Sequence, residues 1–233
     1  MPDQRPSESH AHAFVRYLTI VPQAHYSVFN ADLQMTLYEL FHTNRISRVG
    51  HAVCTPIVCL SALAALAQVR LPPPLDAPQL SLALPVAALL GAHGFLYGRR
   101  IGALTTAVVA MMTLAATLFA VAGVPHALAL AVGGMLLAGT LQTWSHAFEP
   151  VPPPLSGERD FLSLRVWRSQ ASPGRKLATA ALATTAFIAL ELLASFRILP
   201  CQLRVYALAL GRAPSERIAL DRRVTELRAA WPF

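Results

Sequence analysis

Apolar residues follow one another in five long runs along this chain. The runs extend from Ala52 to Val69, Leu80 to Tyr97, Ile101 to Ala122, His126 to Phe148 and Leu177 to Leu199. They contain 18 to 23 residues, close to or above the roughly 20 that an α-helix needs to cross a bilayer. The pattern predicts an all-α fold, a polytopic membrane helical bundle.

The fifth run differs from the other four because it contains Glu191 and Arg197. Charged side chains within a membrane segment normally face protein or water, since exposure to lipid is costly. A complete fifth crossing would also carry the Arg-rich C-terminus to the outer side, against the positive-inside rule. We therefore expect four full spans and a fifth apolar helix that is re-entrant or buried in protein.

The segments around these runs complete the expected organisation. Residues 1–30 are mostly polar and contain no apolar core, which predicts a flexible N-terminal tail and not a signal peptide. Residues 31–50 place apolar side chains at helical spacing and predict a short amphipathic helix, lying in the membrane interface or packed on its neighbours as in a soluble protein. A membrane domain of residues 31–210 would then be followed by an Arg-rich tail, 211–233. The Arg-rich sequence from Cys201 onward predicts a weakly amphipathic helix.

Composition agrees with a membrane protein. Hydrophobic residues make up 55% of the chain and charged residues 13%, against about 25% charged in a soluble domain. The net charge is +7, and Lys176 is the single lysine among 19 basic residues. The arginines flank apolar runs instead of mixing with lysines and aromatics, so we expect no nucleic-acid partner. The expected location is the inner membrane of a bacterium or the endoplasmic reticulum of a eukaryote.

Four histidines fall at one predicted level of the bundle. His42 and His51 lie at the start of the first span, His93 near the end of the second and His146 at the end of the fourth. The arginines at the ends of these runs place that level at the cytoplasmic face, and His126 on the opposite one. Imidazole is the commonest side-chain metal ligand. Any one of them alone is better explained by hydrogen bonding at the interface, but because all four share one level we expect them to form a metal site.

Other polar residues accompany the histidines. Glu149 follows His146 by three residues, so both can face one site if the helix continues. Arginines can bind a carboxylate or phosphate head group, although topology alone accounts for their positions. The candidate substrate-binding residues at this level are Asn44, Arg45, Arg48, Arg99 and Arg100.

Three blocks of the sequence resemble a known family. The first runs from Tyr38 through His42-Thr-Asn44 to a second histidine, His51, nine residues after the first, and to Pro56. The second block is Gln142-Thr-Trp-Ser-His146-Ala-Phe-Glu149, and the third pairs Glu191 with Pro200. Together they are similar to the fungal family that metabolises phytosphingosine to odd-numbered fatty acids. Two departures are a serine where glycine is usual before His146, and a spacing from His146 to Glu149 that is one residue shorter.

The resemblance implies an iron(II)-dependent dioxygenase of 2-hydroxy fatty acids. Such an enzyme uses O2 to shorten the acyl chain by one carbon, in α-oxidation. His42, His51 and His146 would bind the iron, with His93 as a fourth ligand that the family blocks do not include. Glu149 and Glu191 would be catalytic carboxylates that orient a ligating histidine.

Two other classes of function fit the same sequence. One is a different metal-dependent lipid-modifying enzyme, such as a hydroxylase, which would share the histidine site. The other is a small transporter or scaffold. Transport favours polar residues near the bilayer midplane and broken, repeated helices, and the first four runs show neither pattern clearly.

Overall fold

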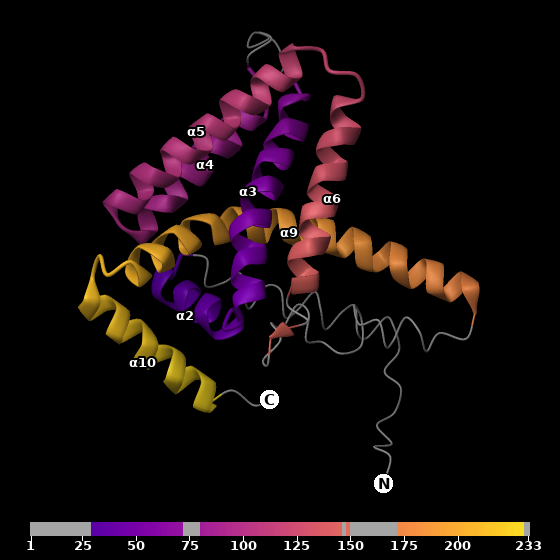
Figure 1. Ribbon diagram of the computed structural model, residues 1–233. Helices are drawn as coiled ribbons and strands as arrows, with labels where there is room; N and C mark the ends of the chain where they lie inside the picture. The colour runs from indigo at the N-terminus through magenta and orange to yellow at the C-terminus, as the bar shows by residue number, and fades with distance from the viewer. Residues whose placement is uncertain (1–28, 72–79, 146–147, 150–171, 231–233) are drawn as a thin grey trace.

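The structure is a computed structural model that describes residues 29–71, 80–145, 148–149 and 172–230, and Figure 1 shows it as a set of helices. The α-helices are α2 (Ala31–Phe41), α3 (Arg45–Ala67), α4 (Ala83–Gly94), α5 (Arg99–Val121), α6 (Ala127–Ser145), α9 (Pro173–Ala209) and α10 (Pro214–Ala230), and η1 (Phe95–Tyr97) is a 3-10 turn. Within the described residues, β pairing is limited to one bridge between Arg70 and Ser81. The expected all-α class is confirmed for this part of the chain.

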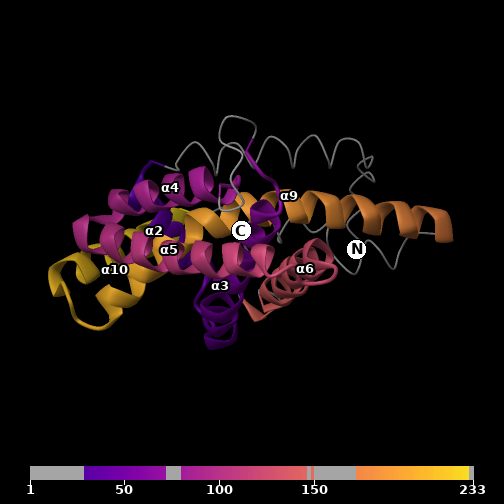
Figure 2. The same cartoon turned by 90° about the horizontal axis from the view of Figure 1, so that it is seen from above.

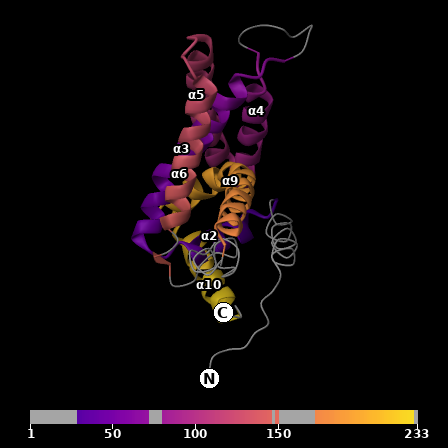
Figure 3. The ribbon, with the colours of Figure 1, turned by 90° about the vertical axis from the view of Figure 1, so that its right-hand side faces the viewer.

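The helices form an apolar bundle on a more polar base. In Figure 1, α9 runs across the lower halves of α3 and α6 and past the lower ends of α4 and α5, and α2 and α10 lie below it and form the base. The side view of Figure 3 shows α9 nearly end-on, beneath α4 and beside the lower part of α6, which agrees with the crosswise arrangement. Seen from above, α4 and α5 lie side by side (Figure 2).

Two helices are long and apolar enough to cross a membrane. α3 and α5 each contain 23 residues, a length of about 34 Å that exceeds a hydrocarbon core of about 30 Å. The segments Ala83–Tyr97 and Ala127–Gln142 are shorter apolar helices. The expectation of four full spans is therefore not supported. In the second run the reason is local, because Leu80 and Leu82 pair with the chain around Arg70 and the last three residues wind as η1.

Small residues bring the bundle helices close together. A Cβ atom on Gly50 would lie 2.8 Å from the Ser145 Cβ and Oγ atoms, and one on Gly134 would lie 2.9 Å from Ser61 Oγ. These two positions keep α3 and α6 in close contact along their length, as small residues do in membrane helix pairs. Gly98, with φ of 102°, forms the turn between η1 and α5, a conformation that glycine adopts without strain.

Residues 31–50 do not form one amphipathic helix as expected. α2 ends at Phe41, and α3 begins at Arg45. The break follows from capping, because the Asn44 side chain accepts a hydrogen bond of 2.8 Å from the Ile46 N–H and so starts a new helix. The first bundle helix therefore starts seven residues before the apolar run, and His51 lies two turns inside it.

The C-terminal region also differs from expectation. The fifth apolar run was expected to end at Leu199, but α9 continues through Pro200 to Ala209. Its last two turns pack Cys201, Val205 and Leu208 against Tyr38 of α2 and Tyr97 of η1. The helix expected in the Arg-rich tail is confirmed as α10, which contributes the fully buried Leu220 to the same cluster. The expected tail of residues 1–30 lies outside the described residues except for its last two positions.

Candidate metal centre

The turn between α2 and α3 brings His42 and His51 together. His42 is the residue that ends α2, and α3 then returns past it so that His51 lies beside it. Both side chains are buried, with exposed fractions of 6% and 2%. Their ring centroids are 4.2 Å apart, with the ring planes at 89°. Two of the four predicted metal ligands are therefore neighbours.

The surroundings of His42 define which ring nitrogen carries its proton. His42 Nδ1 lies 2.5 Å from the carbonyl oxygen of Tyr38. A carbonyl only accepts hydrogen bonds, so Nδ1 is the protonated nitrogen and the lone pair of the neutral ring is on Nε2. Histidines that bind metals commonly donate their second N–H to a backbone carbonyl in this way. The donor set therefore fits a metal ion bound through His42 Nε2.

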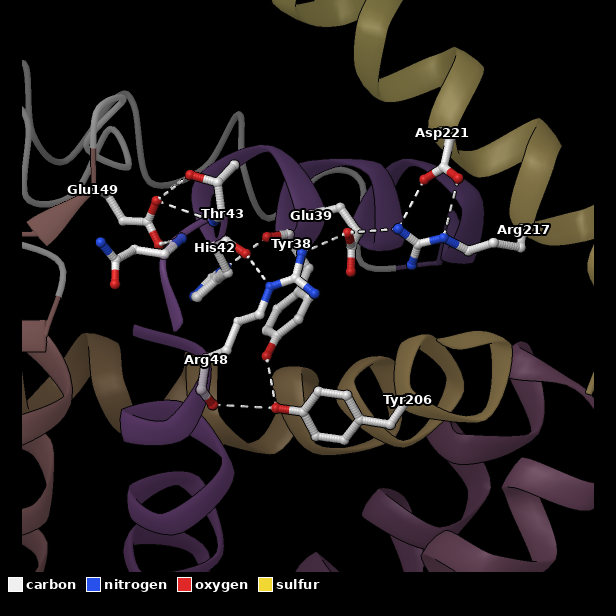
Figure 4. A network of polar contacts seen from close by, with 10 residues as sticks. Tyr38, Glu39, His42, Thr43, Arg48, Glu149, Tyr206, Arg217 and Asp221 are labelled. Carbon is white, nitrogen blue, oxygen red and sulfur yellow. Dashed lines mark hydrogen bonds and ion pairs between the residues drawn. The ribbon is translucent and has the colours of Figure 1, made fainter. Parts of the chain in front are cut away.

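Glu149 holds the backbone next to His42 (Figure 4). Its carboxylate accepts hydrogen bonds from the Thr43 N–H at 3.0 Å, the Thr43 hydroxyl at 2.7 Å and the Asn44 N–H at 2.9 Å. Burial opposes ionisation of this carboxyl, but these bonds and the nearby Ser47 hydroxyl outweigh it and lower the pKa of Glu149. Glu149 was expected to orient a histidine ring, whereas the contacts observed are to the chain that follows His42.

Arg48 and Asn44, two of the predicted substrate-binding residues, make structural contacts. Arg48 donates from Nε to the His42 carbonyl oxygen at 2.6 Å and from NH2 to Glu39 Oε2 at 2.9 Å. The Asn44 side-chain amide donates to the Phe148 carbonyl oxygen at 3.1 Å. Their hydrogen bonds fix the turn that carries His42.

The remaining three predicted substrate-binding residues are exposed arginines. Arg45 lies in the first turn of α3, and Arg99 and Arg100 begin α5. Of these, Arg45 is the nearest in sequence to the turn that carries His42.

Glu39 is a central residue that the sequence analysis did not single out. Its carboxylate is 5% exposed and lies 2.9 Å from Arg48 NH2 and 3.2 Å from Arg217 NH2. Arg217 comes from α10, where it also pairs with Asp221 at 2.8 Å. Figure 4 shows this row of charges running from α10 to the backbone of His42. Arg217 lies 178 positions after Glu39, which is too distant in sequence for any local pattern to reveal the pair.

A second polar network lies on α3 one turn after His51. The Thr55 hydroxyl donates to Gln142 Oε1 of α6 at 3.1 Å and accepts from Gln202 Nε2 of α9 at 3.2 Å. All three side chains are at most 2% exposed. Thr55 follows His51 by four residues, so both lie on one face of α3. The sequence offered two signals for this network, which are that spacing and the presence of Gln142 in the second family block.

The other two predicted ligands are His93 and His146, and of these only His93 is described. The His93 ring lies against Tyr97, with centroids 5.8 Å apart, and His126 precedes α6 at the end remote from Ser145. His146 lies outside the described residues, and so does the side chain of Glu191. Among the side chains that the structure describes, no three His, Cys, Asp or Glu residues form a group able to hold a metal ion. The assignments of His93, His146 and Glu191 stay predictions.

No model of a known protein family, no curated protein and no solved structure matches this chain.

Proposed function

We propose that this protein is a membrane-embedded, iron(II)-dependent dioxygenase that shortens 2-hydroxy fatty acids by one carbon. The observation that carries the proposal is the buried His42–His51 pair, with the proton of His42 held on Nδ1 by the Tyr38 carbonyl. Such an imidazole pair suits iron and other first-row metals. Its position where an apolar bundle meets a polar base suits a substrate with a charged head and an apolar chain.

His146 is the third ligand of this proposal. Ser145, which precedes it, lies against Gly50, which precedes His51. Glu149, which follows it by three residues, is hydrogen-bonded to Thr43 and Asn44. Residues on both sides of His146 in the sequence are thus attached beside the other two histidines, which favours His146 over His93.

The bundle surface supports a location in the membrane. Only 22% of the most apolar stretch of α5 is buried against the rest of the protein. Its exposed side chains include Met111, Leu114 and Leu118, each at least 60% exposed. Apolar patches of this extent mark a membrane or partner interface. We propose that α4 and α6 also cross the membrane, as shorter spans beside α3 and α5. Phe95 and Trp144 are exposed toward the base end, where aromatic residues suit the membrane interface at the cytoplasmic face.

The proposed reaction balances without a further reductant. A 2-hydroxy acid and O2 give an acid one carbon shorter, CO2 and water, as the bond between C1 and C2 breaks and C2 becomes the new carboxyl carbon. Iron(II), when bound, supplies the redox chemistry with O2. His42 and His51 hold the site, and Arg45, exposed in the first turn of α3, provides a cation for the substrate carboxylate. The acyl chain remains in lipid beside the bundle.

The reaction is tested with detergent-solubilised protein, Fe(II), O2 and 2-hydroxypalmitate. We expect pentadecanoic acid by mass spectrometry, and no shortened product from palmitate, which lacks the hydroxyl group. Iron-loaded protein that consumes no oxygen with any 2-hydroxy acyl chain would exclude this reaction. A product that keeps its chain length and gains oxygen would instead identify a hydroxylase.

A further inference from the structure

Tyr38 contacts both histidines of the candidate metal centre. It lies one turn before His42 on α2, and the two rings stack with centroids 4.1 Å apart and planes at 18°. The His51 ring meets the same tyrosine edge-on, with centroids 6.2 Å apart. Because the Tyr38 carbonyl also receives the His42 Nδ1 proton, one residue fixes both the plane and the tautomer of that imidazole.

The hydroxyl group of Tyr38 is held in turn by α9. Tyr206 donates its hydroxyl proton to the Arg48 carbonyl oxygen at 3.3 Å. A tyrosine hydroxyl has a single proton. At the 3.2 Å contact between the two hydroxyl groups, Tyr38 is therefore the donor and Tyr206 the acceptor. The hydrogen bonds therefore run in one direction, from Tyr38 to Tyr206 to Arg48, and Figure 4 draws both contacts.

We propose that Tyr38 is the positioning residue of the metal centre, which holds the His42 imidazole in its metal-binding orientation, and that Tyr206 holds Tyr38. This inference rests on the proposed metal site and adds a role for the aromatic ring. A ligand whose ring is fixed before the metal arrives loses less conformational freedom on binding. The stack and the carbonyl contact restrict the imidazole directly, and the hydroxyl chain restricts the Tyr38 ring against which it stacks.

A role in packing alone makes a different prediction. Tyr38 also belongs to the apolar cluster at the base, so its removal would destabilise the fold in either case. Only a positioning role makes metal affinity and ligand geometry depend on the aromatic face, because a leucine fills space without stacking. The test therefore has to measure the metal site itself.

The experiment measures binding of Co(II), a spectroscopic substitute for Fe(II), to detergent-solubilised full-length protein. Tyr38→Leu should weaken Co(II) binding by about 10- to 100-fold, the range found when groups that orient metal ligands are removed. It should also change the visible absorption of the bound ion. Tyr38→Phe keeps the stack and the carbonyl, so its affinity should stay within about threefold of the wild type.

Tyr206→Phe tests the hydroxyl chain. It leaves the buried Tyr38 hydroxyl without its acceptor, which costs more than removing both hydroxyl groups. We expect weaker Co(II) binding in Tyr206→Phe and recovery in the double variant Tyr38→Phe/Tyr206→Phe. Phe119→Leu, on the apolar part of α5, is the matched control for loss of a packed aromatic ring.

The results separate this inference from the proposed function. Tyr38→Leu that binds Co(II) with wild-type affinity and absorption would overturn the positioning role, as would an equal loss in Phe119→Leu. If Tyr38→Leu does not fold, Tyr38→Met enters the same comparison. Wild-type protein that binds no Co(II) would instead remove the metal site itself, and the inference with it.

Discussion

Glu149 shows how a single carboxylate stabilises the candidate site through the backbone that follows a histidine. It is 8% exposed and accepts three hydrogen bonds from Thr43 and Asn44, the two residues after His42. Two of these donors are backbone N–H groups that precede α3, where a negative charge is favoured by the helix dipole. The ionised form is therefore the form that the folded protein stabilises.

Glu149→Gln should lower the thermal stability of the protein in a pH-dependent manner. The pKa of Glu149 is lowered in the folded state, so its contribution is complete at pH values above about 4.3, its ordinary pKa, and is lost as the pH falls through the lowered value. At pH 7 we expect a loss of about 1–3 kcal/mol, seen as a lower Tm. The difference should shrink in acid. Glu226→Gln, at an exposed position of α10, is the control, and an unchanged Tm at pH 7 would contradict this role for Glu149.

The sequence indicated some of these residues and not others. His42 and His51 could be placed at one level because both lie at the start of the first apolar run. The structure confirms that the two side chains are neighbours. The role of Tyr38 and Glu39 depends on Tyr206 and Arg217, which come from helices more than 160 positions later in the chain. Contacts over such distances follow from docking of α9 and α10, which leaves no periodic signal in the local sequence.

At the scale of elements, α10 is a structural part of the base. Arg217 reaches the buried carboxylate of Glu39, and Arg223 pairs with Asp32 at 3.0 Å. The sequence predicted a weakly amphipathic helix in this Arg-rich tail but not its packing, because arginines flank membrane spans whether or not they form ion pairs. These arginines attach α10 to both ends of α2, and through Glu39 and Arg48 to the His42 carbonyl.

Glu39→Gln should loosen α10 from α2. A buried hydrogen-bonded charge contributes about 1.5–3 kcal/mol, and the partial exposure of Arg48 and Arg217 places the expected loss at the lower end of this range. Amide hydrogen exchange in α10 should accelerate on the order of tenfold, while exchange in α5 stays unchanged. Arg222→Gln, which removes only an exposed pair with Glu226, is the control. Equal exchange of α10 in wild type and Glu39→Gln would show that this ion pair does not attach the helix.

At the scale of the whole molecule, the apolar runs predicted the helices well and their arrangement less well. α5 and α6 begin and end within three residues of the third and fourth runs, because the absence of charges leaves little else for those segments to form. Span length was harder to predict, since the bridge at Arg70 and the η1 turn shorten the second run. The crosswise direction of α9 depends on packing against α2 and α3.

The central claim is that His42 and His51 bind a metal ion where the apolar bundle meets its polar base. The most direct measurement is the iron content of anaerobically purified protein after reconstitution with Fe(II), for the wild type and for His42→Ala, His51→Ala and His126→Ala. We predict a stoichiometric amount of iron in the wild type and in His126→Ala, whose histidine lies before α6 at the remote end of the bundle. His42→Ala and His51→Ala should lose the bound iron. Full iron content in folded His42→Ala, or none in the wild type, would contradict the account.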